Sequence, residues 1–209
     1  MAETETMRPE ESIAWFVNTR ISSIQNDYLS ANGKSRGARK LASLRHALLM
    51  PIGSDAEAWS LEFEGLPSAL VGRGPEPSAG EVAVHAALTL YALHQQGQSR
   101  PMHIRGIGHG FGNAIRQLVV QEKDRYSNLE VGEMPRRFRA FITAETMDET
   151  LHYARQMVQQ LRGAGIAVDY AKFAAQLYRL QNPYKVDQVR LAWGREYVFA
   201  GKANNDSSK

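Results

Sequence analysis

The chain has 209 residues, 43% of them hydrophobic, and a formal net charge of +3, so it can bury a core as one large domain or two small ones. It contains no cysteine, which excludes disulfides, thiolate metal sites and a cysteine nucleophile, and fits a reducing compartment. It has no apolar run long enough to span a membrane, and its start, MAETETMRPEE, lacks the basic and apolar regions of a secretory signal, so we expect a cytoplasmic protein.

Apolar residues at helical spacing predict helices along almost the whole chain, between two polar tails, 1–9 and 201–209, that we expect to be disordered. The predicted helices are, in chain order, 10–31, 35–50, 55–64, 81–96, 111–122, one starting at Pro135, 148–162, one capped by Asp169, and 184–199. Strand alternation, hairpin signals and fixed-period repeats are absent, so the predicted fold class is all-α. A short connector separates a predicted amino-terminal bundle, 10–128, from a carboxy-terminal one, 134–200.

The central helix, residues 81–96, carries no charged residue after Glu81, so it would be apolar on nearly every side and belongs in the core. His85 and His94 on this helix are expected to be hydrogen-bonded core or cap residues rather than metal ligands. Aromatic residues elsewhere also lie at helical spacing among aliphatic ones, so we expect most of them to pack in the core rather than to stack on bases. They include Trp15, Trp59, Trp193, Tyr178 and Tyr197.

Positive charge is clustered along the chain. The first eleven residues contain four Glu and one Arg, so the remainder carries +6, and the segments 33–46, 94–121 and 134–144 contain basic residues but no acidic ones. The candidate nucleic-acid-binding residues are the cations of these segments: Lys34, Arg36, Arg39, Lys40, Arg45, Arg100, Arg105, Arg116, Arg136, Arg137 and Arg139. Each segment alone is typical of a solvated helix face, but three together favour phosphate binding.

The first segment places cations where a helix disfavours them. Arg36, Arg39 and Lys40 lie in the first turns of the helix predicted from Ser35, where the helix dipole disfavours a cation by about 0.3–1 kcal/mol. Helix stability therefore does not explain these residues, whereas a bound phosphate does, because free N–H groups and guanidinium groups would bind the same anion.

The third segment repeats this arrangement. Arg136 and Arg137 occupy the first turn of a helix that starts at Pro135. The alternative for Arg137 is a salt bridge to a nearby carboxylate. Glu133, Glu145 and Asp148 are the acids in reach.

The glycine-rich loop at 97–112 contains Arg100 and Arg105 with no acid, which also points to an anionic partner. Its GIGHGFGN sequence lacks the GK[ST] ending and the preceding strand of a phosphate loop, so a nucleotide site is not favoured. His103 and His109 have no carboxylate or zinc-ligand spacing near them, so we expect neither a metal nor a cofactor. An alternative function is a metal-free nuclease in which these histidines exchange a proton and Arg105 stabilises charge.

A further alternative, a helical transcription regulator, would need a helix-turn-helix. The connector between the helices at 111–122 and from Pro135 is about a dozen residues long, far longer than the tight turn of that motif.

Taken in order, several segments resemble the CasB family, the small subunit of the type I-E CRISPR surveillance complex Cascade. The matching segments are ARKLASLRHALL, AALTLYALHQQ, the glycine loop leading into GNAIRQL, PRRFRAFITA, LHYARQMVQQLRGAGIAVDYAKFAAQLYRL and VRLAWGREYVF. They extend from about Ala38 to Phe199. No single motif is diagnostic, and the resemblance depends on their order, above all on LYALHQQ and RRF.

The resemblance implies an all-helical, non-catalytic subunit that is present as a pair beside other Cascade subunits and a guide RNA. Such a subunit contacts the target strand and the displaced strand of opened DNA, mainly through phosphates, while a separate nuclease cuts the DNA. The residues carried over by motif position are Arg45 of SLRHA, Arg116 of GNAIRQL and the Arg136 and Arg137 pair. One departure is His46, where a second basic residue is expected and a mostly neutral side chain stands.

Overall fold

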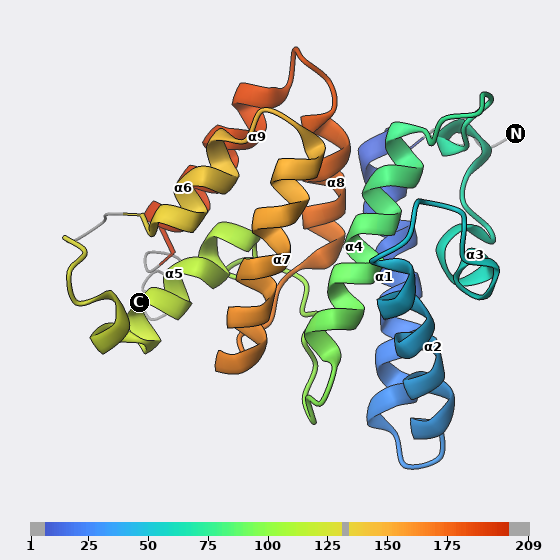
Figure 1. Ribbon diagram of the computed structural model, residues 1–209, viewed down its shortest axis with the longest axis horizontal. Coiled ribbons are helices and arrows are strands. Elements are labelled where there is room, and N and C mark those ends of the chain that lie inside the picture. The colour runs from blue at the N-terminus through green and yellow to red at the C-terminus, as the bar shows by residue number, and fades with distance from the viewer. Residues whose placement is uncertain (1–6, 131–133, 201–209) are drawn as a thin grey trace, which may run out of the picture.

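The structure, a computed structural model, describes residues 7–130 and 134–200 and is built from helices (Figure 1). The helices are α1 (Pro9–Leu29), α2 (Lys34–Ala47), α3 (Ala56–Phe63), α4 (Ala79–Gln95), α5 (Phe111–Gln121), α6 (Arg136–Thr143), α7 (Met147–Ala164), α8 (Tyr170–Leu180) and α9 (Val186–Val198), with the short 3-10 helices η1 (Ser68–Leu70) and η2 (Lys123–Tyr126). The all-α prediction is confirmed. Within the described residues, an isolated bridge between His103 and Val168 is the only β-type pairing. None of the helices in this part of the chain is long and apolar enough to cross a membrane.

Local sequence signals explain where several helices begin and end. The Ser78 hydroxyl accepts a hydrogen bond from the Glu81 amide while the Glu81 carboxylate accepts one from the Ser78 amide, so α4 starts with a capping box. Asp169 caps α8 as predicted, since its carboxylate accepts a hydrogen bond of 2.9 Å from the Lys172 amide. At the other end of α7, Gly165 adopts a left-handed conformation with φ of 63° that stops the helix.

The central position of α4 is confirmed. Its side chains are buried along nearly the whole helix, including Leu88 and Tyr91. His94 is buried as well and its Nδ1 lies 2.9 Å from the Tyr170 hydroxyl. Burial lowers the pKa of His94 to about 3, so this imidazole is neutral at physiological pH. The prediction of a hydrogen-bonded core histidine is therefore confirmed.

The helices pack in two groups that do not follow the order of the chain (Figure 1). The first group contains α1, α2, α3, α4 and α8, and the second contains α5, α6, α7 and α9. Contacts between α4 and α7 join the groups, and one hydrophobic core runs through both. Helix α5 precedes the connector but packs with α9, and α8 follows the connector but packs with α1. Domain boundaries at 10–128 and 134–200 remain a prediction. The predicted tails lie outside the described residues except for residues 7–9, of which Arg8 is the N-cap and Pro9 the first residue of α1.

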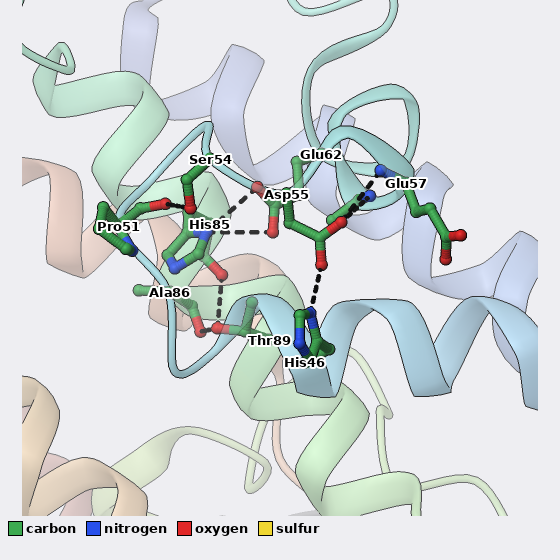
Figure 2. A network of polar contacts seen from close by, with 10 residues as sticks. His46, Pro51, Ser54, Asp55, Glu57, Glu62, His85, Ala86 and Thr89 are labelled. Atoms are coloured by element: carbon green, nitrogen blue, oxygen red, sulfur yellow. Dashed lines mark hydrogen bonds and ion pairs between the residues drawn. The ribbon is translucent and has the colours of Figure 1, made fainter.

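The short helix α3 is attached to α2 and α4 through two histidine–carboxylate pairs (Figure 2). His46 of α2 lies 2.8 Å from the Oδ2 atom of Asp55, the residue that caps α3. His85 of α4 lies 3.0 Å from the Oε1 atom of Glu62, in the last turn of α3, and both side chains are buried. The hydrogen bond from His46 is the main reason why the pKa of Asp55 is lowered. The core role predicted for His85 is confirmed.

The prediction of packed aromatic residues is correct for the carboxy-terminal helices and wrong for two tryptophans. Trp193 and Tyr197 are fully buried. Trp15 and Trp59, however, are 56% and 59% exposed. In α1, Ile13 and Phe16 face the core and Trp15 lies between them in sequence, so helical geometry turns it outward.

Candidate nucleic-acid interface

The start of α2 carries four of the predicted cations, and an acid from the neighbouring helix neutralises two of them. Asp27 of α1 accepts hydrogen bonds from Arg36, at 2.5 and 2.9 Å, and from Lys40, at 2.9 Å. These bonds, the one from Arg36 first, hold the pKa of the Asp27 carboxyl well below its usual range. The inference that a phosphate is needed to explain Arg36 and Lys40 is therefore wrong. Lys34 and Arg39 are exposed and form no ion pair with the described residues.

A second group of cations lies where α4 ends and consists of Arg45, Arg100 and Arg162, which we call the α4-end cluster. Arg162 of α7 donates a hydrogen bond of 3.1 Å to the Gln96 Oε1 atom. Arg100 donates one of 2.6 Å to the carbonyl of Gly165, three residues further along.

Arg45 of α2 completes the α4-end cluster. Burial lowers the pKa of its guanidinium group, and the positive charge of Arg162 acts in the same direction. No carboxylate in the described part of the chain pairs with Arg45 or Arg162. A half-buried guanidinium without a counter-charge is a favourable position for an anion, because the anion restores the interactions that burial removes. His46, next in sequence, is already engaged by Asp55.

The glycine-rich loop is tied to its surroundings rather than open around an anion. The amide of Gly106 donates to the Asp169 carboxylate at 3.1 Å, and the Gly112 amide donates to the Glu196 carboxylate at 3.0 Å. A Cβ atom at Gly110 or Gly112 would come within 2.5 Å of Glu196 or of the Trp193 carbonyl, so glycine is needed there for packing. Because Glu196 already occupies the amino-terminal end of α5, the backbone of this helix start is not available to a phosphate.

Arg105 and Arg116, two cations of the segment 94–121, have different surroundings. Arg105 is exposed and makes no ion pair with the described residues, and its charge acts on the nearby His103. Arg116 of α5 is half-buried and its Cζ atom lies 5.6 Å from the ring centroid of Tyr197, a cation–π contact that holds the guanidinium group at the surface.

The geometry of His103 does not favour the nuclease alternative. The ring is 4% exposed, its Nδ1 accepts a hydrogen bond of 3.1 Å from the Tyr170 amide, and its Nε2 lies 3.2 Å from the Asn18 Oδ1 atom. Burial lowers the pKa of His103, although the charge of Asp169 opposes this. A buried imidazole with both nitrogens engaged cannot reach a phosphodiester as a general acid or base requires. No group of residues suited to bind a metal ion is present in the described ranges.

A third group of cations surrounds two tyrosines where α5, η2 and α6 meet, and consists of Arg116, Arg125, Arg136 and Arg137. We call it the tyrosine cluster. The Cζ atom of Arg125 lies 5.8 Å from the ring centroid of Tyr126, the residue that lines one cavity with Arg136 and Arg137. Tyr126 interacts electrostatically with Arg137 and with Tyr197, the ring under Arg116.

The tyrosine cluster is mostly without counter-charge. Arg125 pairs with Glu122 at 2.9 Å, but Arg116, Arg136 and Arg137 form no ion pair with the described residues. In particular, the proposed bridge from Arg137 to Glu145 or Asp148 does not form, and Glu133 lies outside the described residues. Arg139, the remaining residue of the segment, donates a long hydrogen bond of 3.4 Å to the Met134 carbonyl and has a further interaction.

The structure thus brings the predicted cations together in separate groups. The start of α2, the loop after α4 and the end of α7 reach the lower side of the view in Figure 1, whereas α6 starts higher, on the left of the view. Arg125 and Arg162 join these groups although sequence reasoning did not single them out. Arg125 lies between acidic residues in the sequence, and Arg162 lies in the last turn of a helix, where the helix dipole is sufficient to explain a cation.

The chain is similar to known proteins over most of its length. The model of the family described as CRISPR-associated protein Cse2 matches residues 40–197. A crystal structure of CasB from Thermobifida fusca has 30% sequence identity and a TM-score of 0.68, and the match covers 89% of this chain and 97% of that one. A Cse2-family CRISPR-associated protein from Thermus thermophilus shares the fold at 22% identity, with a TM-score of 0.58 and coverage of 87% of this chain and 96% of that one. No curated protein sequence matches significantly.

Proposed function

Because the chain belongs to the CRISPR-associated Cse2 family, also called CasB, the small subunit of type I-E Cascade, we propose that it binds nucleic-acid backbone without reading sequence. In this proposal the chain is a non-catalytic part of the RNA-guided complex, beside the other subunits, the guide RNA and a second copy of itself. It contacts the target strand and the displaced strand and thereby stabilises the R-loop. The exchange of DNA pairing for guide pairing is nearly balanced, so modest backbone contacts are enough to shift it.

The observation that carries the proposal is the set of guanidinium groups without counter-charge. Arg116, Arg136 and Arg137 in the tyrosine cluster, and Arg45 in the α4-end cluster, form no ion pair with described carboxylates. Unpaired cations raise the local potential and attract a polyanion. These four are also the residues that the family resemblance carries over by motif position.

The contacts expected from such a surface are with phosphates rather than base edges. Arginines that are held by aromatic rings or by backbone carbonyls, as Arg116 and Arg100 are, present the guanidinium fork that suits a phosphate. The helix pair α5 and α6 lacks the tight turn of a helix-turn-helix, since more than a dozen residues separate the two helices. We therefore expect tolerance of DNA sequence, in contrast to a transcription regulator.

The proposal predicts salt-dependent binding. In titrations of labelled single-stranded DNA with the full chain, log K should fall against log salt concentration with a slope of about −0.7 to −0.9 per phosphate engaged. Arg45→Ala and Arg116→Ala should each weaken binding by about tenfold and make the slope shallower by about one. The same variants in a reconstituted complex should slow R-loop formation.

Arg73→Ala is the matched control for this experiment. It removes one exposed positive charge from the segment between η1 and α4, at the opposite end of α4 from the α4-end cluster, and should leave affinity unchanged. An affinity that does not respond to salt, or an equal loss in the control, would contradict the proposal. Unfolding of the Arg45 and Arg116 variants in thermal melts would assign these residues a structural role instead.

A further inference from the structure

A pocket of about 260 Å³ opens between α5, η2, α6 and α7 in the middle of the tyrosine cluster. Its floor is apolar and consists of buried side chains: Ile115, Leu118, Phe138 and Met157. Its rim is polar and cationic, with Arg125, Arg136, Arg137, Tyr126 and Gln160. None of the described residues that line it is acidic. An apolar floor below several guanidinium groups suits a ligand with two parts: a flat apolar group that fits the floor, and negative charges that the guanidinium groups bind.

The rim is held in place by contacts among its own side chains and with Glu122. The Tyr126 hydroxyl donates a hydrogen bond of 3.0 Å to the Gln160 Oε1 atom, so the tyrosine ring is fixed as one wall. Arg125 is held over this ring and by Glu122. Arg136 and Arg137 remain without a carboxylate partner in the described residues, so their charges are available to a ligand.

The size of the pocket limits the ligand. Pockets for drug-sized molecules have volumes of about 300–1,000 Å³, and this one is slightly smaller. It therefore accommodates one ring system rather than a dinucleotide or a folded peptide. A phosphate alone would gain nothing from the apolar floor, because burying an anion against apolar atoms without partners is costly. In a nucleic-acid strand, the base has an apolar face that can contact the floor, and the backbone phosphates on its two sides stay outside the pocket, where the rim arginines lie.

We propose that this pocket takes one unstacked base of a single strand while Arg136 and Arg137 bind the phosphates on its two sides. The proposal rests on the proposed function and deepens it, because it makes the site selective for single strands: paired and stacked bases of a duplex cannot enter. With so few polar groups in the floor, the pocket holds any base by stacking and contact rather than by reading its edge.

The test compares two labelled strands with the same phosphates: oligothymidine of about twenty nucleotides and its fully abasic counterpart. The full chain should bind the abasic strand about tenfold more weakly, the effect of losing one stacked base. A parallel series with oligouridine and an abasic ribose strand tells RNA from DNA, and a loss in either series supports the proposal. Equal affinity for strands with and without bases in both series overturns it, whether or not any variant folds.

Filling the pocket locates the effect. Gln160→Phe places a ring in the pocket without changing charge, and it should lower the affinity for oligothymidine to that for the abasic strand, so that the difference between the two strands disappears. Gln159→Phe is the matched control, since it adds the same ring to an exposed position one residue earlier on α7 and should behave as wild type. A difference between the strands that persists in Gln160→Phe, with an unchanged melting temperature, overturns the assignment to this pocket.

The outcomes also separate this proposal from the proposed function. Binding that depends on salt but not on bases refutes the base pocket and leaves backbone binding intact. Binding that is absent, or insensitive to salt, for both strands refutes the proposed function itself and the pocket with it.

Discussion

The start of α2 and the tyrosine cluster carry the same kinds of residue in opposite electrostatic settings. Both contain several cations within a few residues of a helix start, in segments, 33–46 and 134–144, that contain no acid of their own. At α2, however, Asp27 of the preceding helix neutralises Arg36 and Lys40, whereas Arg136 and Arg137 of α6 have no described carboxylate partner. Local charge counting identifies both places as candidates, and only the arrangement of neighbouring helices distinguishes a structural ion pair from an available charge.

The largest expected effect separates the two places by removing one charge at each. Arg137→Ala should weaken binding of single-stranded DNA by about tenfold, because it removes an unneutralised phosphate contact. Arg36→Ala should change affinity by less than about twofold, because the lost charge was already balanced. Fluorescence anisotropy at fixed salt measures both.

Thermal melts of the same two variants should show the reverse order. Arg36→Ala should lower the melting temperature because Asp27 loses its strongest partner, and Arg137→Ala should not. Equal losses of affinity in the two variants would mean that the contrast between the two regions has no functional meaning.

An intermediate effect should follow from freeing the cations of α2. Asp27→Asn removes the carboxylate from Arg36 and Lys40 and leaves both charges at the surface. If the start of α2 lies along the path of the nucleic acid, affinity should rise about twofold to threefold and the salt dependence should become steeper. Glu76→Gln, which removes an exposed carboxylate without an ion pair among the described residues from the segment between η1 and α4, is the control for net charge. A rise that is equal in both variants would point to bulk charge alone.

The smallest effect is a dependence of stability on pH. The pKa of Asp27 is lowered in the folded protein, so its ion pairs add stability that is fully present above the ordinary carboxyl pKa of about 3.9 and is lost as pH falls below that value. The melting temperatures of wild type and Asp27→Asn should therefore differ by a constant amount between about pH 7 and pH 5, and the difference should shrink progressively as pH falls below about 4. A difference that stays constant below about pH 4 would mean that Asn disturbs packing rather than charge.

Much of the fold was predictable because the signals are local. The apolar run that becomes α4 shows its burial without any neighbour, and the cap at Asp169 is a property of a few consecutive residues. Trp15 shows the limit of such patterns. Its spacing in the sequence is compatible with a packed position, but the apolar stripe on α1 passes through Ile13 and Phe16 instead.

The candidate site was predictable as a list of cations and not as an arrangement. Arg136 and Arg137 come from motif positions, yet their grouping around Tyr126 depends on η2, which the sequence did not single out. The pairing of Asp27 with Arg36 depends on how α1 and α2 fold back on each other, and the pattern of one helix does not contain that information. Arg162 reaches Arg45 from another part of the chain by the same kind of long-range packing.

The position of α8 has a consequence for the order of events during synthesis. Helix α1 packs against α8, which begins at Tyr170, so the two partners are separated by most of the chain. A ribosome that has completed α1 and α4 has made two helices whose common packing partner, α8, does not yet exist. We expect these helices to remain incompletely packed, and open to chaperones, until the last part of the chain emerges. The first group of helices can therefore pack completely only after α8 has been synthesised, and a product truncated before α8 cannot complete this group.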